Sequence, residues 1–181
     1  MATTIHSRRT LHHGKAFSLV SENVTLDNAV TTDIEYIQHP GATAIVPILD
    51  KSHVILIKQY RHSLRKEIWE IPAGTLDPQE SLLACARREL IEETGFSADR
   101  WQSLGEIVPV PGYSNERIHL YLAAGLKTAA RNLDEDEIID VHEIVFEATL
   151  GMIKRGDIQD AKSISGLFMA SEWLKENESW L

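Results

Sequence analysis

The chain has 181 residues, of which 43% are hydrophobic and 25% are charged, a composition that suits one globular domain or a core with a small appendage. Its formal net charge of −9 at pH 7 argues against a protein that grips a long nucleic acid, because phosphate binding needs clustered Lys and Arg. The sequence contains neither a signal-peptide pattern nor an apolar run of the roughly 20 residues that span a membrane. The single cysteine, Cys85, cannot form an intrachain disulfide, so nothing indicates an oxidising compartment. Together these features lead us to expect a cytoplasmic protein with no nucleic acid or membrane partner.

The first third of the chain predicts strands. Residues 11–37 contain alternating, β-prone stretches such as AFSLVSENVTL and DIEYIQ, which predict an antiparallel meander. The sequence HPG at residues 39–41 interrupts this pattern. ATAIVPIL and HVILIKQYR follow as two apolar runs joined by residues 50–52, and they predict a hairpin that is buried on both faces.

The remainder alternates between strands and helices. EIWEIPAG predicts a short strand and a tight loop, and GEIVPVPG and RIHLYLAAG predict further strands. From about Phe146 to Leu174 the apolar residues have helical spacing, interrupted at Gly156 and Asp157. The fold class is therefore α/β, with an α/β/α sandwich around a mixed sheet and an antiparallel β-sheet at the N-terminus.

A further helix is predicted between Gly74 and Phe96. Asp77 has the residue type of an N-cap, Pro78 that of the first helical position and Glu80 that of a capping-box glutamate, so the helix is expected to start at about Pro78. Gly95 can end it in the left-handed conformation. The inner face is expected to carry the apolar stripe Leu83, Ala86 and Leu90.

Glu89, Glu92 and Glu93 stand at i, i+3 and i+4 on this helix, so their carboxylates share one face near the negative end of the helix dipole. Like charges in this arrangement repel each other, and a cation is expected among them. Ligands that are all oxygen favour Mg²⁺, with Mn²⁺ as a substitute. The alternative is an acidic helix face that is only solvated.

The segment GTLDPQESLLACARRELIEETGF matches the pattern G-x5-E-x7-R-E-U-x-E-E-x-G-U, in which U is apolar. A solvated acidic face would not require the spacing of both glycines and the arginine. The chain is thus identified as a member of the Nudix superfamily, and the resemblance implies metal-dependent hydrolysis of a nucleoside diphosphate linked to another group.

Outside this segment, which we call the Nudix box, the chain resembles ADP-ribose pyrophosphatases and related nucleoside diphosphate sugar hydrolases. The resemblance extends from about Gly14 to Leu174, through the segments QHPGATAIVPI, QYR, EIPAG, PVPG, DEDE and GDIQDAKSISGL. It implies a small-molecule nucleotide sugar as substrate. ADP-ribose, cleaved to AMP and ribose 5-phosphate, is the leading candidate, while GDP-mannose and other nucleotide sugars remain open.

The resemblance also implies roles for individual residues. The carbonyl of Ala73 and the carboxylates of Glu89 and Glu93 are expected to ligate the metal, with Glu92 as a ligand or a partner of the ligands. Arg88, at i, i+4 from Glu92, is expected to orient that carboxylate.

The general base is expected in the segment LDEDEIIDV, with Glu137 as first choice and Glu135 as its substitute, the alternative being a solvated acidic loop. Arg61 is expected to bind a phosphate or the terminal ribose, the alternative being an ordinary surface arginine. Glu70 could accept hydrogen bonds from the ribose or the base. A loop over the substrate is expected from Pro111, Tyr113 and Glu116.

Family members of this branch are homodimers that exchange the N-terminal sheet. Residues 1–40 are expected to form such an exchanged β-strand region, which helps to hold the nucleobase, and residues 41–181 are expected to form the Nudix hydrolase domain. Two other functions stay open. One is a Nudix pyrophosphohydrolase of oxidised nucleoside triphosphates or dinucleoside polyphosphates, and the other is a noncatalytic sensor that binds ADP-ribose.

Overall fold

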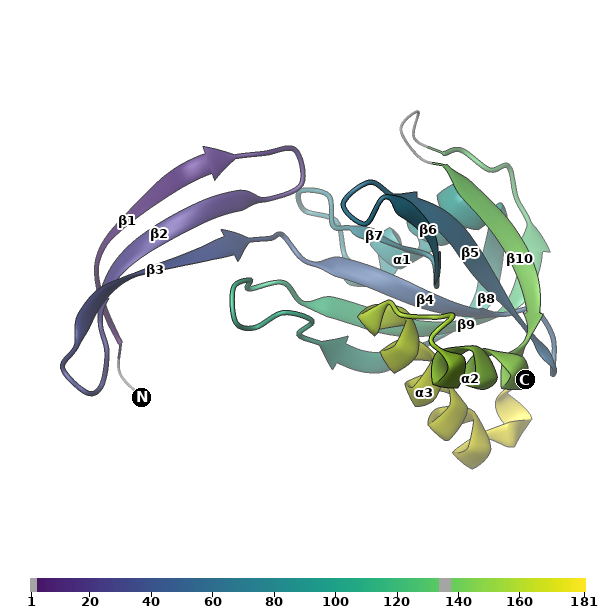
Figure 1. Cartoon of the computed structure of the whole chain (residues 1–181). Helices are drawn as coiled ribbons and strands as arrows, with labels where there is room; N and C mark the ends of the chain where they lie inside the picture. Colours follow the sequence, from purple (N-terminus) through teal and green to yellow (C-terminus); the bar gives the residue numbers. More distant parts are fainter. Residues whose placement is uncertain (1–2, 134–137) are drawn as a thin grey trace. The chain divides into compact units, whose positions relative to one another are not determined.

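The structure, a computed structural model, describes residues 3–133 and 138–181 and divides into two compact units (Figure 1). The N-terminal unit comprises Met1–Gly41 and Val108–Arg117, and the main unit comprises Ala42–Ile107 and Ile118–Leu181. None of the helices in the described ranges is long and apolar enough to cross a membrane.

The N-terminal unit contains an antiparallel sheet in the order β1–β2–β3. Its strands are β1 (Thr4–His13), β2 (Ser18–Thr25) and β3 (Thr31–Gln38). The predicted antiparallel sheet is confirmed, and β1 extends it upstream of the region where the alternating pattern begins.

The segment GEIVPVPG was predicted as a strand, but only its first three residues belong to one, β8 (Phe96–Ile107). The strand does not continue through Pro109 and Pro111, because prolines cannot donate the hydrogen bonds that a ladder needs, and the stretch Val108–Arg117 belongs to the N-terminal unit. This stretch runs beside the end of β3: the N–H of Ile37 donates to the carbonyl of Tyr113 at 2.8 Å, and the N–H of Asn115 donates to the carbonyl of Ile37 at 3.1 Å.

The main unit is built on one mixed sheet, in the order β10–β5–β4–β9–β8, with β6 paired to β5 and β7 paired to β4. Strands β4 and β9 are parallel, and the other pairs are antiparallel. The strands are β4 (Ala42–Ile48), β5 (His53–Arg61), β6 (Lys66–Glu70), β7 (Ala73–Thr75), β8 (Phe96–Ile107), β9 (Ile118–Thr128) and β10 (Ile139–Val145).

The predicted hairpin of β4 and β5 exists only at its turn. The two strands pair at Ile48 and Val54 and then diverge, so that β6 takes the place beside β5 and β7 the place beside β4. The N–H of Ile45 donates to the carbonyl of Pro72 at 2.9 Å. Because β4 and β5 diverge, Pro72, which precedes the loop at Ala73 and Gly74, is held against β4 in the centre of the sheet.

Helices cover both faces of this sheet, which confirms the α/β/α sandwich (Figure 1). On one face, alternate residues of β4 such as Val46 pack with side chains of α2 (Phe146–Arg155) and α3 (Ala161–Glu176). On the other face, Ile45 packs with Ala86 and Leu90 of α1. The predicted interruption between the last two helices is present, because Gly156 ends α2 in the left-handed conformation.

Helix α1 spans Leu82–Thr94, so the prediction that it starts at about Pro78 was wrong. Gln79 has a φ of 67°, which lies outside the right-handed helical region and prevents the turn at Pro78 from continuing into the helix. Ser81 is the N-cap instead, and its side chain accepts a hydrogen bond from the N–H of Ala84. The C-terminal end lies where it was predicted, with Gly95 at φ 74°.

Candidate active site

The loop at Ala73 and Gly74 lies directly against α1. The N–H of Ala73 donates to Oε2 of Glu93 at 2.8 Å. A Cβ on Gly74 would lie only 1.8 Å from Oε1 of Glu89, so glycine is the residue that lets the loop approach this carboxylate. The structure thus brings together the loop and two of the three glutamates that the sequence predicts as a metal site.

Two of these glutamates are more buried than the sequence predicts. The exposed fractions of Glu89 and Glu93 are 8% and 2%, and both lie on α1 beside the buried Ala86 and Leu90. Glu89 and Glu93 therefore do not lie on a solvated acidic face of the helix. A buried carboxylate needs compensating charge or hydrogen bonds.

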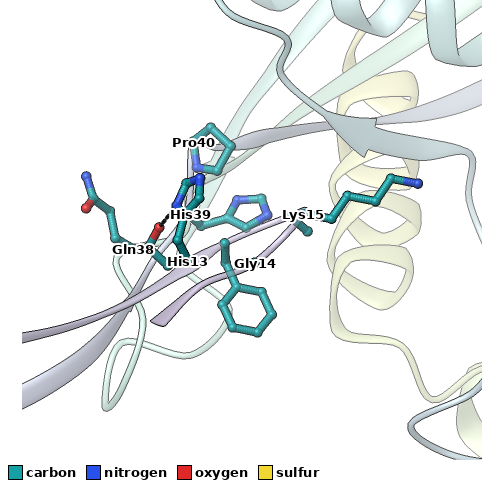
Figure 2. A pocket seen from close by; sticks show the side chains of 9 residues that line it. His13, Gly14, Lys15, Gln38, His39 and Pro40 are labelled. Carbon is teal, nitrogen blue, oxygen red and sulfur yellow. Dashed lines mark hydrogen bonds between the residues drawn. The ribbon is translucent and has the colours of Figure 1, made fainter. Parts of the chain in front are cut away.

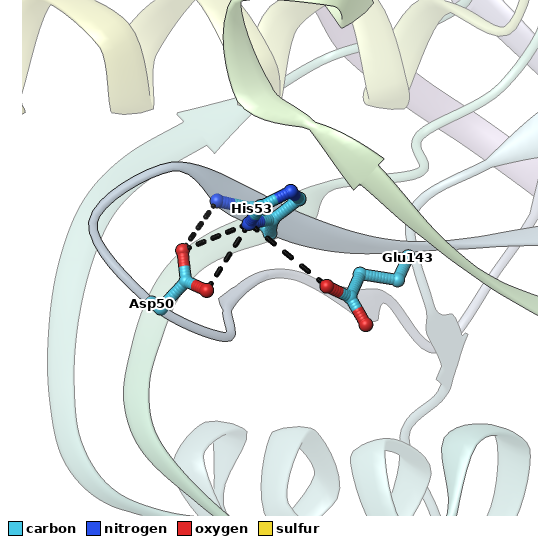
Figure 3. Close-up of side chains that lie close together, drawn as sticks. All are labelled: Asp50, His53 and Glu143. Atoms are coloured by element: carbon cyan, nitrogen blue, oxygen red, sulfur yellow. Dashed lines mark hydrogen bonds and ion pairs between the residues drawn. The ribbon is translucent and has the colours of Figure 1, made fainter.

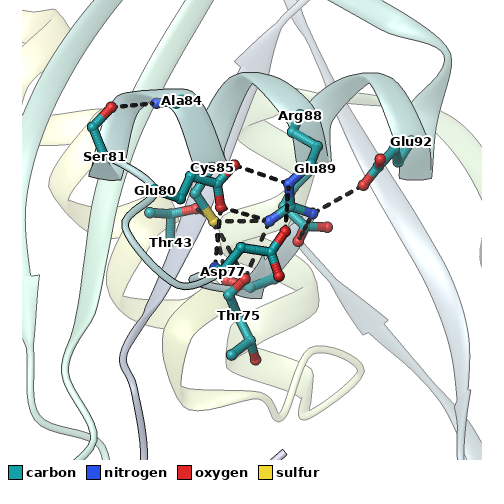
Figure 4. Close-up of polar contacts among 11 residues, drawn as sticks. Thr43, Thr75, Asp77, Glu80, Ser81, Ala84, Cys85, Arg88, Glu89 and Glu92 are labelled. Carbon is teal, nitrogen blue, oxygen red and sulfur yellow. Dashed lines mark hydrogen bonds and ion pairs between the residues drawn. The ribbon is translucent and has the colours of Figure 1, made fainter.

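Arg88 forms hydrogen bonds to three carboxylates in this region (Figure 4). Its Nε and Nη2 donate to the two oxygens of Glu80 at 3.0 and 2.9 Å, and its Nη1 donates to Glu89 at 2.6 Å and Glu92 at 3.0 Å. Nη2 also donates to the carbonyl of Thr75 at 3.2 Å. Arg88 therefore ties three glutamates to the loop at residues 73–75, where the sequence predicts one of these contacts.

Protonation equilibria at this arginine follow from its contacts. The pKa of Arg88 is raised, first by its hydrogen bonds to Glu80, although burial opposes the shift. The pKa of Glu80 is correspondingly lowered, chiefly by the hydrogen bonds from Arg88. The sequence pattern predicted helix capping alone for Glu80, so its pairing with Arg88 was missed. The signal was its spacing from Gly74, because Glu80 is the first glutamate of the matched pattern.

The side chains present fit a divalent cation. Arg88 brings one positive charge to the carboxylates of Glu80, Glu89 and Glu92, and Glu93 adds a fourth, nearly buried carboxylate on the same helix. Closely spaced negative charge in a buried site favours a bound cation. Carboxylate and carbonyl oxygens are the ligands that Mg²⁺, Ca²⁺ and Mn²⁺ prefer.

A second charged cluster lies beside this site. Arg61 donates from Nε and Nη2 to the two oxygens of Glu70 at 2.6 and 2.7 Å, and Lys162 donates to one of them as well. Burial alone would raise the pKa of Glu70, but Arg61 and Lys162 outweigh that effect and lower it. The pKa of Arg61 is raised chiefly by Glu70, with a contribution from the charge of Glu93, so the cluster lies within electrostatic reach of the glutamate site.

The loop predicted to cover the substrate belongs to the N-terminal unit. Pro111, Tyr113 and Glu116 all lie within Val108–Arg117, and the side chain of Tyr113 is exposed. The same unit contains a pocket of about 400 Å³ (Figure 2), a size typical of small-molecule sites. Its lining residues are His13, Gly14, Lys15, Ala16, Phe17, Ser18, Gln38, His39 and Pro40.

Glu135 and Glu137, the predicted general bases, lie outside the described residues. Arg131 precedes them in the chain and was missed by the sequence reasoning. It donates from Nε to the carbonyl of Glu93 and from Nη2 to the carbonyl of Ile139, both at 2.8 Å. The end of α1 is thereby tied to the first residue of β10.

Asp50, His53 and Glu143 form another group with ligand-type atoms, all within 4.8 Å of one another (Figure 3). Asp50 accepts hydrogen bonds from the N–H groups of Ser52 at 2.7 Å and His53 at 2.9 Å, and its pKa is lowered chiefly by the bond from Ser52. These bonds are those of a side chain that stabilises the β4–β5 turn. Turn stabilisation accounts for the pair of Asp50 and His53, and the group contains none of the predicted metal ligands.

Comparisons with known proteins agree with the geometry. The model of the NUDIX domain matches residues 38–166. The chain is 39% identical over 153 residues to the methanol dehydrogenase activator of Bacillus methanolicus, covering 83% of each protein. It is 35% identical over 159 residues to the ADP-ribose pyrophosphatase of Bacillus subtilis (strain 168), covering 87% of this chain and 86% of the relative. A crystal structure of an ADP compounds hydrolase superposes with a TM-score of 0.86 at 27% identity, covering 98% of this chain and 96% of that chain.

Proposed function

The chain belongs to the NUDIX domain family, and from that premise we propose that it hydrolyses the diphosphate bond of nucleoside diphosphate sugars, with ADP-ribose as leading substrate. The observation that carries the proposal is the close approach of the loop at Ala73 and Gly74 to Glu89 and Glu93. Arg88 holds Glu89 in this position. The substrate class is supported by the names of the relatives, among them an ADP-ribose pyrophosphatase.

We assign Mg²⁺ to the site, with Mn²⁺ as a substitute. The carbonyl of Ala73 and the carboxylates of Glu89 and Glu93 are the proposed ligands, with Glu92 as a further ligand or as a partner of the ligands. When bound, the cation supplies charge neutralisation at the diphosphate and a more acidic bound water. Arg88 orients two of these carboxylates, because its Nη1 bonds both Glu89 and Glu92.

Arg61 is proposed to bind a phosphate oxygen of the substrate. Its side chain is 39% exposed, whereas that of Glu70 is 1% exposed with both oxygens bonded to cations. We therefore assign Glu70 to the positioning of Arg61 and not to the ribose or the base. The edge of the guanidinium that carries Nη1 takes no part in the pair with Glu70 and suits an anionic ligand.

Glu137 is proposed as the general base, with Glu135 as its substitute. The base takes a proton from the attacking water, the water oxygen forms a bond to one phosphorus of the diphosphate, and the bridging P–O bond breaks. From ADP-ribose the products are AMP and ribose 5-phosphate. The acidity of the sequence in this segment and its place just before β10 support the assignment.

The N-terminal unit is proposed to recognise the nucleobase in a homodimer that exchanges residues 1–40 between subunits. Its pocket is lined by the aromatic side chain of Phe17 and by the rings of His13 and His39 (Figure 2), groups that stack on or bond to a base. Pro111, Tyr113 and Glu116 are proposed to cover the substrate. We place the protein in the cytoplasm, consistent with its single cysteine.

The test is hydrolysis of a substrate panel with Mg²⁺ or with EDTA, followed by chromatographic identification of the products. The panel contains ADP-ribose, GDP-mannose, UDP-glucose, a dinucleoside polyphosphate and 8-oxo-dGTP. AMP plus ribose 5-phosphate, formed only with Mg²⁺, is the expected result. GMP plus mannose 1-phosphate, with weak ADP-ribose turnover, would change the assigned substrate from ADP-ribose to GDP-mannose.

Two outcomes would overturn the proposal. Turnover confined to the triphosphate or the dinucleoside polyphosphate would assign the protein to another class of Nudix enzyme. Binding of ADP-ribose without turnover of any compound in the panel would favour the noncatalytic sensor.

A further inference from the structure

The N-terminal turn of α3 contacts the two residues that lead into the metal loop, although α3 covers the sheet face opposite to α1. Lys162 donates to Oε2 of Glu70, and the N–H of Ile71 donates to Oγ of Ser163 at 2.8 Å. Both contacts join residues that are 92 positions apart in the sequence. Two consecutive residues of the chain are therefore held by one helix end.

Asp160 organises this helix end. Its Oδ2 accepts hydrogen bonds from the N–H of Ser163 at 2.9 Å, from Oγ of Ser163 at 2.5 Å and from Nζ of Lys162 at 3.0 Å. Asp160 is the N-cap of α3, and Ser163 is buried. Because the side chain of Lys162 is only 11% exposed, the cluster is a fixed part of the interior and not a solvated surface pair.

We infer that Lys162 and Ser163, both hydrogen-bonded to Asp160, are positioning residues for the proposed active site and act through two connections. Lys162 holds Glu70, and Glu70 in turn holds the guanidinium of Arg61 by two parallel hydrogen bonds. Ser163 holds the backbone at Ile71, two residues before the proposed metal-ligating carbonyl of Ala73. The inference rests on the proposed function for the role of Arg61 and for the role of Ala73.

The two connections have different measurable consequences. Loss of Lys162 leaves Glu70 with one of its two cationic partners, so Arg61 is oriented less well and the substrate phosphate is bound less tightly. Loss of the Ser163 hydroxyl leaves a buried N–H at Ile71 without its acceptor, so the metal loop is placed less well. A role in stability alone would not separate substrate binding from metal binding.

The experiment measures two dissociation constants for each variant without turnover. Calorimetry in EDTA gives the dissociation constant of ADP-ribose, and electron paramagnetic resonance gives that of Mn²⁺. Lys162→Met is expected to raise the ADP-ribose constant about tenfold, the effect of weakening one charge-assisted hydrogen bond, and to leave the Mn²⁺ constant within about twofold. Ser163→Ala is expected to raise the Mn²⁺ constant about tenfold and to leave the ADP-ribose constant within about twofold.

The control is Lys175→Met, which removes an exposed ion pair with Glu172 from the same helix and should change neither constant. Lys162→Arg, which keeps the charge, should restore ADP-ribose binding. In an Arg61→Met background, Lys162→Met should add no further loss, because both changes act through one guanidinium. Additive losses, or unchanged ADP-ribose binding in Lys162→Met, would overturn the Lys162 connection.

Failure of the proposed function gives a different pattern. If the unmodified protein hydrolyses no nucleotide sugar with Mg²⁺, the substrate assignment is refuted, and the Ser163→Ala measurement with Mn²⁺ still decides the second connection. An unchanged Mn²⁺ constant in that variant would overturn it. If Lys162→Met does not fold, Lys162→Gln, which keeps a donor but loses the charge, replaces it with the same expected direction.

Discussion

Gly74→Ala tests whether the close approach of the metal loop to Glu89 determines cation binding. The added Cβ would lie 1.8 Å from Oε1, 1.9 Å from Cδ and 2.4 Å from Oε2 of that side chain. Ordinary contacts between such atoms are above about 3 Å, so the carboxylate must retreat by more than about 1 Å. It would then lose its 2.6 Å hydrogen bond from Arg88.

The expected magnitude follows from that bond. A hydrogen bond between charged groups contributes about 1.5–3 kcal/mol, whereas replacing glycine by alanine stabilises by about 0.4–1 kcal/mol through the unfolded chain. The protein without metal should therefore lose only about 0.5–2.5 kcal/mol of stability. If the displaced carboxylate is a ligand, the Mn²⁺ dissociation constant should rise about 10- to 100-fold.

The assay is Mn²⁺ titration by electron paramagnetic resonance, together with urea unfolding in EDTA. Gly112→Ala is the matched control, because a Cβ at that glycine would meet no atom within 4 Å, and its Mn²⁺ affinity should be unchanged. If Gly74→Ala binds Mn²⁺ within about twofold of the unmodified protein, Glu89 is not held where the cation binds and the reasoning is refuted.

Three further predictions concern single carboxylates. Glu93→Gln should lower turnover by about 100-fold or more while leaving the urea midpoint in EDTA nearly unchanged, because an amide oxygen can still accept the N–H of Ala73; a large loss of stability would contradict a role in metal binding alone. Glu137→Gln should lower kcat by about 10²- to 10⁴-fold if Glu137 is the base, and a kcat near that of the unmodified protein would remove it from that role. Glu80 has a lowered pKa, so its stabilising effect is present at neutral pH and is lost as the pH falls below its ordinary pKa of 4.5. Urea unfolding of Glu80→Gln in EDTA should therefore show a deficit at pH 7 that shrinks in acid, and a deficit independent of pH would refute the assignment.

Local patterns predicted the parts of the site that lie on one helix. The spacing of Glu89, Glu92 and Glu93, the contact of Arg88 with Glu92 and the end of the helix at Gly95 all depend on residues a few positions apart. The start of the helix was misplaced because an N-cap signal at Asp77 competes with one at Ser81, and the backbone at Gln79 decides between them.

Contacts between distant segments were not predictable in the same way. The bonds from Lys162 to Glu70 and from Ile71 to Ser163 join residues that are 92 positions apart, and periodicity carries no information about such pairs. The divergence of β4 from β5 was missed for the same reason. The apolar pattern identifies both strands, whereas the intervening partners β6 and β7 are set by the tertiary fold.

Cys85 gives this protein a built-in chemical reporter. Its thiol is buried on α1, within contact of Thr43 and of the carbonyls of Gly74 and Thr75, and burial raises its pKa to about 11. A thiol-reactive probe can reach it only when the helix separates from the sheet and the loop. The rate of alkylation under native conditions therefore reports on the separation of α1 from the loop at the proposed active site.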